Sequence, residues 1–244
     1  MEDAEYYKMA EVEDRMWYYR SLHGHFHRLL RARFGSRPCD LLDAGCGSGG
    51  LMHYLQRRAP AWRITGIDLS PIACRLAGRR CHASIIEGSV TALPFGEAAL
   101  DAVLAADVLY ELDEPAAALR EFCRCLRPGG WIVVNVPAYR WLWSYHDVAV
   151  RSKHRFVRRE VANLLTTAGF VVELNTHWNA LPFPLIVAKR KLFARPGDTS
   201  DVKLYPAPVE AFFRGLMAIE PAWLRLGGRW AWGSSILAVG RKPA

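Results

Sequence analysis

Two histidines and an aspartate lie close together in residues 144–156, SYHDVAVRSKHRF, where nothing about folding obviously requires them. His146 and His154 are candidates for a general base, because an imidazole titrates near neutral pH. Asp147 follows His146 directly, but adjacent side chains of a helix or strand diverge, so the two need not touch. A metal site would need a further ligand of suitable spacing, which this sequence does not offer, so we expect no bound metal. The segment can serve acid–base chemistry, bind an anionic substrate or form a solvated loop.

A glycine-rich turn, LLDAGCGSGG, follows a predicted strand and precedes a predicted helix at residues 41–50. Its residues fit two templates, G-x-G-x-x-G at Gly45, Gly47 and Gly50 and D-x-G-x-G-x-G at Asp43, Gly45, Gly47 and Gly49. The first is typical of dinucleotide-binding proteins and the second of S-adenosylmethionine enzymes. In either case the backbone can approach a ligand closely where a helix N-terminus presents free N–H groups. Asp68, at the end of the next strand, can accept hydrogen bonds from both ribose hydroxyls of an adenosine, which suits both cofactors.

The elements that must position these residues alternate along the chain. Residues 6–34 carry apolar and aromatic side chains at helical spacing and end at Gly35, which predicts leading helices. Five short apolar segments then read as strands, with helical stretches between most of them: CDLLDAG, WRITGID, SIIEGSV, LDAVLAAD and GWIVVNVP. This alternation predicts a doubly wound, parallel α/β sheet. Beyond it we expect a helix near 157–168, a strand FVVELNT, a proline-rich segment, an amphipathic helix and a last strand SSILAVGRK.

Composition narrows the class of protein. The 244 residues suit a single domain, and a net charge of +8 favours anionic partners without choosing among them. The six cysteines form no C-x-x-C pair, which indicates reduced thiols and a cytoplasmic protein. The first residues, MEDAEYY, lack the pattern of a signal peptide, and the longest apolar run, LPFPLIVA, is too short to cross a membrane.

Several ordered motifs resemble one family. ALDAVLAADVLYEL and LREFCRCLRPGGWIVVNVP are similar to the fourth and fifth strands of the class I S-adenosylmethionine-dependent methyltransferases, and IIEGSVTALPF to their adenine-binding segment. The resemblance runs from about residue 40 to 137 and is closest to small-molecule, type 11-like members. It implies a Rossmann-like seven-stranded sheet with an antiparallel last strand, for which SSILAVGRK is the candidate. The expected organisation is a single methyltransferase domain over 1–244, with a helical cap at 1–36, a cofactor-binding core at 37–138 and acceptor-side elements at 139–156 and 177–232.

The resemblance also implies which residues bind S-adenosylmethionine. Carried over by position, they are Tyr18, Arg20, Gly45, Cys46, Gly47, Asp68, Leu69, Ser89, Val90 and Asp107. In a subset of the family an aromatic-aromatic-x-x-Arg segment, here within MWYYRSLH, covers the cofactor. Tyr18 or Tyr19 would then lie over the site and Arg20 would pair with the cofactor's carboxylate; the alternative is helix packing with a surface arginine. Ser89 stands where the family usually has an acidic or amide side chain, so backbone groups of Ser89 and Val90 would contact the adenine.

The same resemblance places the candidate catalytic residues. Tyr110 and Glu111 would face the reacting centre, with Glu111 in place of a histidine that many small-molecule members carry. The segment after the fifth strand would lie beside the cofactor's methyl group, so His146 and His154 would be near the acceptor. This segment is also strongly basic, through Arg140, Arg151, Lys153, Arg155, Arg158 and Arg159. The basic side chains favour an acceptor with a carboxylate or a phosphate.

Two further patterns concern the acceptor side. Aromatic side chains alternate at Tyr139, Trp141, Trp143 and Tyr145, which suits either one face of an extended segment or the core. In PVEAFFRGLMAIEPAWLRL apolar residues recur at helical spacing. That apolar face can pack on its own domain, close an acceptor pocket, form a homodimer interface or contact a membrane surface, so the role of the 207–232 insertion stays open.

These observations predict a biosynthetic enzyme that methylates an O, N or C atom of a small-molecule, natural-product or lipid-linked acceptor with an anionic group. An RNA methyltransferase is an alternative that the net charge favours. The chain has no separate RNA-binding module, however, and NVPAY lacks the N-P-P-Y order of amino-methylating nucleic-acid enzymes, so nucleic acid is not the expected partner. A non-catalytic cofactor-binding protein and an oxidoreductase are the remaining alternatives.

Overall fold

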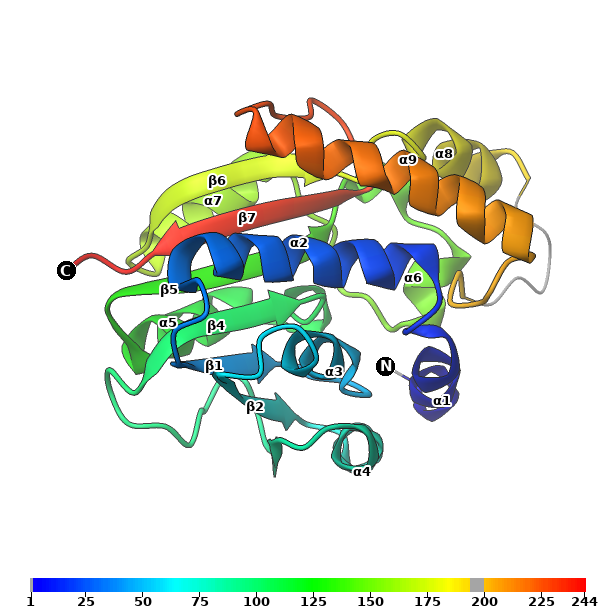
Figure 1. The fold of residues 1–244 in the computed structure, drawn as a ribbon. Helices are drawn as coiled ribbons and strands as arrows, with labels where there is room; N and C mark the ends of the chain where they lie inside the picture. The colour runs from blue at the N-terminus through cyan, green and yellow to red at the C-terminus, as the bar shows by residue number, and fades with distance from the viewer. Residues whose placement is uncertain (1, 194–199) are drawn as a thin grey trace.

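The computed structural model describes residues 2–193 and 200–244. Its centre is a seven-stranded sheet of β1 (Cys39–Ala44), β2 (Trp62–Asp68), β3 (Ser84–Glu87), β4 (Leu100–Ala106), β5 (Leu126–Pro137), β6 (Val171–Trp178) and β7 (Ser235–Arg241). The strand order is β3-β2-β1-β4-β5-β7-β6 (Figure 1). The first five strands are parallel and β7 runs antiparallel to both of its neighbours. The predicted doubly wound sheet with an antiparallel last strand is confirmed.

Helices cover both faces of this sheet. They are α1 (Asp3–Val12), α2 (Trp17–Phe34), α3 (Gly50–Gln56), α4 (Pro71–Arg80), α5 (Pro115–Cys125), α6 (Tyr145–Ala149), α7 (Arg158–Thr167), α8 (Phe183–Lys191) and α9 (Ala207–Arg225), with 3-10 turns η1 (Leu109–Glu111) and η2 (Arg140–Leu142). Successive strand residues point to opposite faces, so Leu41 packs among residues of α2 and α3, whereas Leu42 packs among residues of α5 and α7. The sheet therefore separates two apolar layers.

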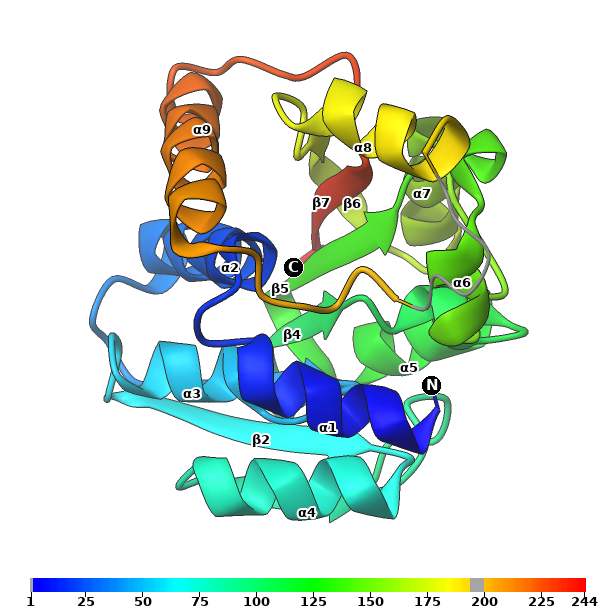
Figure 2. The ribbon, with the colours of Figure 1, turned by 90° about the vertical axis from the view of Figure 1, so that its right-hand side faces the viewer.

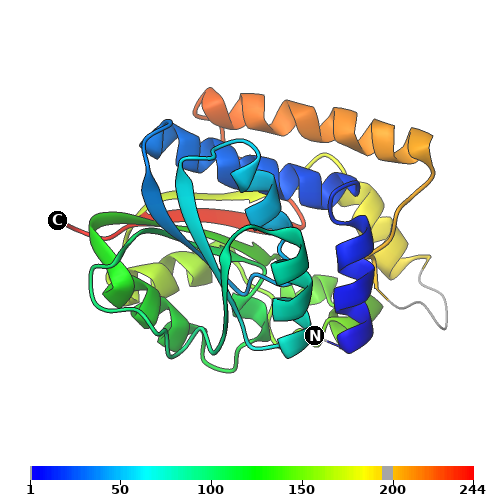
Figure 3. The same cartoon turned by 60° about the horizontal axis from the view of Figure 1, so that its bottom comes forward.

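The leading segment forms two helices rather than one continuous run. In α2 the buried residues Leu22, Phe26 and Leu30 follow one another every four positions, and the helix ends where Gly35 adopts a φ of +60°. The helix α1 packs beside α4 through Tyr6, Met9 and Ala73 (Figure 3). Figure 2 views the side toward which the arrowheads of β4 and β5 point, and α1, α6, α8 and the segment before α9 surround that side.

The acceptor-side elements differ from two expectations. The proline-rich segment forms the helix α8, because Pro182 and Pro184 lie at its beginning, where no intrahelical N–H bond is lost. The alternating aromatic residues do not share one face of an extended segment, because η2 and α6 interrupt it. Trp141 and Trp143 are exposed, so they do not lie in the core either. Within 2–193 and 200–244, no helix has the length and apolar character needed to cross a membrane.

Candidate active site

A cavity of about 520 Å³ lies at the carboxyl ends of β1, β2 and β4. Its lining includes Gly45 and Gly47 after β1, Asp68 as the last residue of β2 and Asp107 after β4. Open α/β sheets bind ligands at this edge, and the volume is within the range of cavities for nucleotide-sized ligands. Residues of α1, of α6 and α8, and of the segment before α9 complete its walls.

The glycine-rich turn has the backbone shape that its sequence requires. Gly45 and Gly47 have φ values of +74° and +52°, a region that residues with a Cβ rarely adopt. A Cβ on Gly45 would lie 2.5 Å from Cγ2 of Val108, and one on Gly47 would lie 2.7 Å from Cε of Met9. The carboxylate of Asp68 accepts a hydrogen bond from the Gly47 N–H at 2.9 Å, which joins the turn to the end of β2.

Asp43, the last acidic residue of β1, is buried without a partner. Neither carboxylate oxygen has a hydrogen-bond partner among the described residues, although both are inaccessible and the residue lines the cavity. Burial, with smaller contributions from the charges of Glu13 and Asp68, raises the pKa of Asp43 to about 8. At neutral pH this carboxyl is therefore largely protonated, and a cationic group of a ligand beside it would favour its ionised form.

Glu13 connects α1 to the glycine-rich turn, and sequence reasoning missed it. Its carboxylate accepts hydrogen bonds from Ser48 Oγ at 2.5 Å and from Arg80 Nη1 at 2.8 Å. Burial raises the pKa of Glu13, while the adjacent Arg80 opposes that shift. This contact holds the end of α1 against the glycine-rich turn, but the three residues are far apart in the sequence, so no local pattern could predict it.

Asp107 lies at the centre of a buried hydrogen-bond network at the end of β4. It adopts a φ of +59°, which is strained for a residue with a side chain. The Tyr18 hydroxyl donates to its Oδ2 at 3.1 Å and Asn135 Nδ2 donates to its Oδ1 at 2.8 Å. Trp178 Nε1 in turn donates to Asn135 Oδ1 at 2.6 Å, and the Trp178 ring stacks on Tyr18 with centroids 5.3 Å apart. Burial raises the pKa of Asp107 to about 7.

Sequence reasoning missed Asn135 and Trp178 as members of this network. The one available signal was an amide side chain inside the otherwise apolar strand GWIVVNVP, because a buried amide needs partners. Trp178 gave no such signal, since a tryptophan at the end of a strand usually indicates core packing.

The structure brings together all of the predicted cofactor-binding residues except Arg20. The cavity is lined by Tyr18, Gly45, Cys46, Gly47, Asp68, Leu69, Ser89, Val90 and Asp107. Arg20 is exposed on α2 and is not among the described lining residues. The inward side of that helical turn is occupied by Tyr18 and Tyr19, so the structure does not support the expected pairing of Arg20 with a cofactor carboxylate.

Two of the three candidate catalytic residues line the cavity. Tyr110 and His146 do so, whereas His154 is not among the described lining residues and its ring lies near Phe156. Burial raises the pKa of the Tyr110 hydroxyl well above its usual value. The structure therefore keeps Tyr110 as a neutral phenol at neutral pH and gives His154 no contact with the cavity.

His146 is neutral and has a defined tautomer. Its Nδ1 accepts a hydrogen bond from the Asp201 N–H at 3.1 Å, so the proton of the neutral ring is on Nε2. Burial, together with the charge of Arg190, lowers the pKa of His146 to about 4. In this state Nε2–H is a hydrogen-bond donor rather than a general base.

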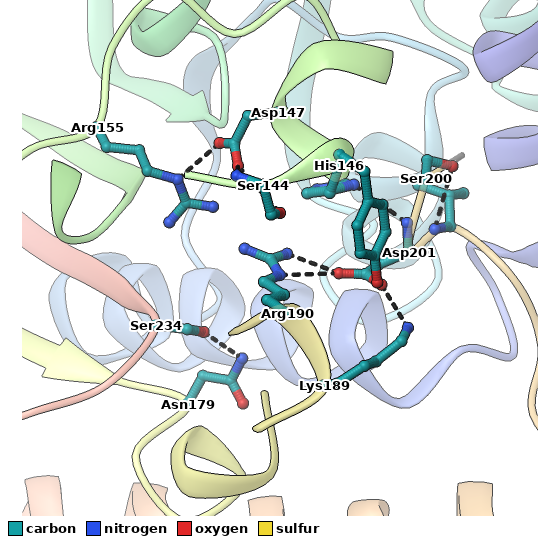
Figure 4. Close-up of polar contacts among 12 residues, drawn as sticks. Ser144, His146, Asp147, Arg155, Asn179, Lys189, Arg190, Ser200, Asp201 and Ser234 are labelled. Carbon is teal, nitrogen blue, oxygen red and sulfur yellow. Dashed lines mark hydrogen bonds and ion pairs between the residues drawn. The ribbon is translucent and has the colours of Figure 1, made fainter. Parts of the chain in front are cut away.

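Three basic side chains that line the cavity, those of Arg155, Lys189 and Arg190, pair with two carboxylates (Figure 4). Asp147 accepts a hydrogen bond from Arg155 Nε at 2.6 Å, and both side chains are 2% exposed. Asp201 accepts bonds from Arg190 at 2.7 and 3.0 Å and also from Lys189. Of the six basic residues noted between Arg140 and Arg159, Arg155 is the one that lines the cavity in the described part of the chain. This stretch is therefore not simply a solvated loop.

Comparisons with known proteins agree with this geometry. Residues 42–134 match the model of a family described as a methyltransferase domain. The chain is 32% identical over 142 residues to a malonyl-(acyl-carrier protein) O-methyltransferase of Hahella chejuensis, which covers 54% of this chain and 50% of that protein. The chain spans about half the length of the first curated relatives that it matches.

Two solved structures share the fold over most of the chain. One is a methyltransferase in complex with the Trm112 activator of Haloferax volcanii, with a TM-score of 0.66, 22% identity and coverage of 99% of this chain and 96% of that one. The other is geranyl diphosphate C-methyltransferase of Streptomyces coelicolor, in complex with Mg²⁺, geranyl diphosphate and S-adenosyl-L-homocysteine. Its TM-score is 0.59, with 19% identity and coverage of 91% and 79%. The glycine-rich turn, the sheet order and the family match identify a class I S-adenosylmethionine-dependent methyltransferase domain in this chain, and the cofactor of such domains is S-adenosylmethionine.

Proposed function

We propose that this protein transfers a methyl group from S-adenosylmethionine to an O, N or C atom of a small acceptor that carries an anionic group. The observation that supports this most directly is the division of charge in the cavity. The half beside the glycine-rich turn presents the carboxyl groups of Asp43 and Asp68, while the far half presents Arg155 and Arg190. A cationic cofactor and an anionic acceptor fit these two halves.

The residues of the first half fit S-adenosylmethionine. This cofactor combines an adenosine with a sulfonium and an ammonium, and it supplies an activated methyl group when bound. Gly45 and Gly47 leave room where a Cβ would clash with Val108 or Met9. The unpartnered Asp43 carboxyl suits the positive charge, and Leu69 offers an apolar surface at the cavity lining.

Residues of the second half are suited to hold and orient the acceptor. We assign His146 to this role as a neutral Nε2–H donor, and Tyr110 as a phenol at the same cavity. His154 has no place in this proposal, because it does not line the cavity. Orientation of an acceptor against an activated methyl group supplies much of the barrier reduction in such a displacement, and an acceptor atom of low pKa needs no base.

The names of two similar proteins support an anionic acceptor. A malonyl group carries a carboxylate and geranyl diphosphate carries a diphosphate. Neither acceptor is assigned to this chain, because one relative is matched over half its length and the other shares the fold alone.

Isothermal titration with S-adenosylmethionine, S-adenosylhomocysteine and NADH tests the cofactor half. We expect the first two to bind and Asp68→Ala to abolish their binding, because that change frees the Gly47 N–H and removes the expected ribose acceptor. Asp113→Ala is the matched control, since that carboxylate is 83% exposed and pairs only with Lys153 in the described structure. Binding of NADH alone would overturn the assignment.

Labelled S-adenosylmethionine then tests transfer. Panels of small carboxylates, phosphate esters, uncharged analogues of both and total RNA would be offered to the wild-type protein. Label in an anionic small molecule supports the proposal. Label in RNA or in the uncharged analogues alone would refute it.

A further inference from the structure

Two arginine side chains are directed at the same space in the acceptor half of the cavity (Figure 4). Arg155 follows α6, and its Nε donates to Asp147 while its Nη1 donates to the Ala138 carbonyl at 2.7 Å. Arg190 is on α8, and its Nε and Nη2 both donate to Asp201. Each guanidinium is thus held from behind by a carboxylate. In the part of the chain that the structure describes, Arg155 Nη2 and Arg190 Nη1 have no protein partner.

Both arginines are largely withdrawn from solvent. Arg155 is 3% exposed and the Arg190 side chain is 10% exposed. Burial lowers the pKa of Arg155, and the positive charge of Arg190 acts in the same direction, which shows that the two guanidinium groups repel one another. Two like charges directed at one space destabilise that arrangement unless an anion lies between them.

In the described residues, the ion pairs of this space join three cations, Arg155, Lys189 and Arg190, to two carboxylates, Asp147 and Asp201. The charge of Arg155 also lowers the pKa of Asp107, which burial raises to about 7. His146 adds no charge but contributes a third N–H donor, because its Nδ1 is occupied by the Asp201 amide.

We infer that Arg155 and Arg190, with His146 Nε2–H, form an oxyanion subsite that binds a carboxylate or phosphate group of the acceptor. The inference rests on the proposed function, since it assigns the anionic group of the same acceptor. An oxyanion offers several oxygens, so each free guanidinium N–H can form a separate charge-assisted hydrogen bond. Lysine would supply a point charge but not this fixed arrangement of donors.

The subsite also indicates which atom of the acceptor is not methylated. Guanidinium contacts stabilise the negative charge of a bound oxyanion before reaction and so lower its nucleophilicity. The bound oxyanion therefore serves as an anchor, and the methyl group is transferred to another atom of the acceptor. The expected substrate class is a small molecule with a carboxylate or phosphate that remains unmethylated in the product.

Anion titration of the protein saturated with S-adenosylhomocysteine tests the subsite. Malonate represents the carboxylate source, and inorganic phosphate and pyrophosphate represent the phosphate source, each measured by isothermal titration at low ionic strength. At least one probe should bind, and the better probe identifies the group. Arg190→Gln should weaken its binding about 10- to 100-fold, as expected for loss of a charge-assisted bond. Arg159→Gln, at an exposed position of α7, should bind like the wild type.

Arg190→Lys is a second variant in case Arg190→Gln does not fold, because a lysine keeps a cation beside Asp201. It lacks the free Nη1 donor, so it should also bind the anion probe more weakly than the wild type. Absence of anion binding to a protein that binds S-adenosylhomocysteine refutes the subsite alone. Equal binding by wild type and both Arg190 variants refutes it as well. Failure of the wild type to bind S-adenosylhomocysteine refutes the proposed function instead.

Discussion

The Asp147 carboxylate should contribute a large share of the stability of the acceptor side. Asp147→Ala leaves the Arg155 guanidinium buried without its charged partner, which costs roughly 3–5 kcal/mol. It also removes the hydrogen bond at 2.9 Å from the Ser144 N–H that begins α6. Loss of such a helix cap costs about 1 kcal/mol. The free energy of unfolding should therefore fall by about 4–6 kcal/mol.

Urea unfolding followed by circular dichroism measures this loss. In thermal unfolding of this 244-residue chain, the melting temperature should fall by roughly 8 to 24 °C, at roughly 2–4 °C per kcal/mol. Asp147→Asn keeps a hydrogen-bond acceptor without the charge and should lie between the wild type and Asp147→Ala. Asp113→Ala removes an exposed ion pair and should cost less than about 1 kcal/mol. Equal losses for the two alanine variants would show that the Asp147–Arg155 pair is solvated, and the argument from burial would be wrong.

Three further predictions concern residues that line the cavity or lie in its glycine-rich turn. Gly47→Ala should weaken S-adenosylhomocysteine binding at least tenfold in a titration, because the new Cβ would lie 2.7 Å from Cε of Met9 at a φ of +52°. Gly78→Ala is the control and should bind like the wild type, because a Cβ there meets no atom within 4 Å. Burial raises the pKa of Asp43 to about 8, whereas the same carboxyl in the unfolded chain loses its proton near pH 4. Between these two pH values the folded state holds a proton that the unfolded state has released. The free energy of unfolding therefore decreases as the pH rises from about 4 to about 8. Asp43→Asn should accordingly stabilise the protein more at pH 8 than at pH 5 in urea unfolding, and equal gains at both pH values would contradict it. The His146 ring, with a pKa lowered to about 4, should keep the Nε2–H signature in nitrogen NMR spectra from about pH 5.5 to 8, and a titration in that interval would exclude the assigned donor role.

Local pattern was sufficient to predict most of the residues that line the cavity beside the glycine-rich turn. Gly45 and Gly47 needed no tertiary information, because positive φ and close backbone approach favour glycine wherever they occur. Asp68 ends one parallel strand and Asp107 follows another, and the carboxyl ends of such strands meet at one edge of the sheet. Arg20 was misplaced because helical spacing does not say how far a helix is rotated about its axis, and Tyr18 and Tyr19 occupy the inward side.

The sequence by itself determined the order of the strands and of most helices, the glycine-rich turn and the presence of titratable groups in residues 144–156. The tertiary structure alone decided what those groups can do. His146 is a neutral donor because it is buried against the amide of Asp201, which is 55 positions away, and Arg155 reaches the cavity because Asp147 and the Ala138 carbonyl hold it there. Burial and long-range partners set the charge, tautomer and direction of a side chain, and neither can be derived from residue type and spacing.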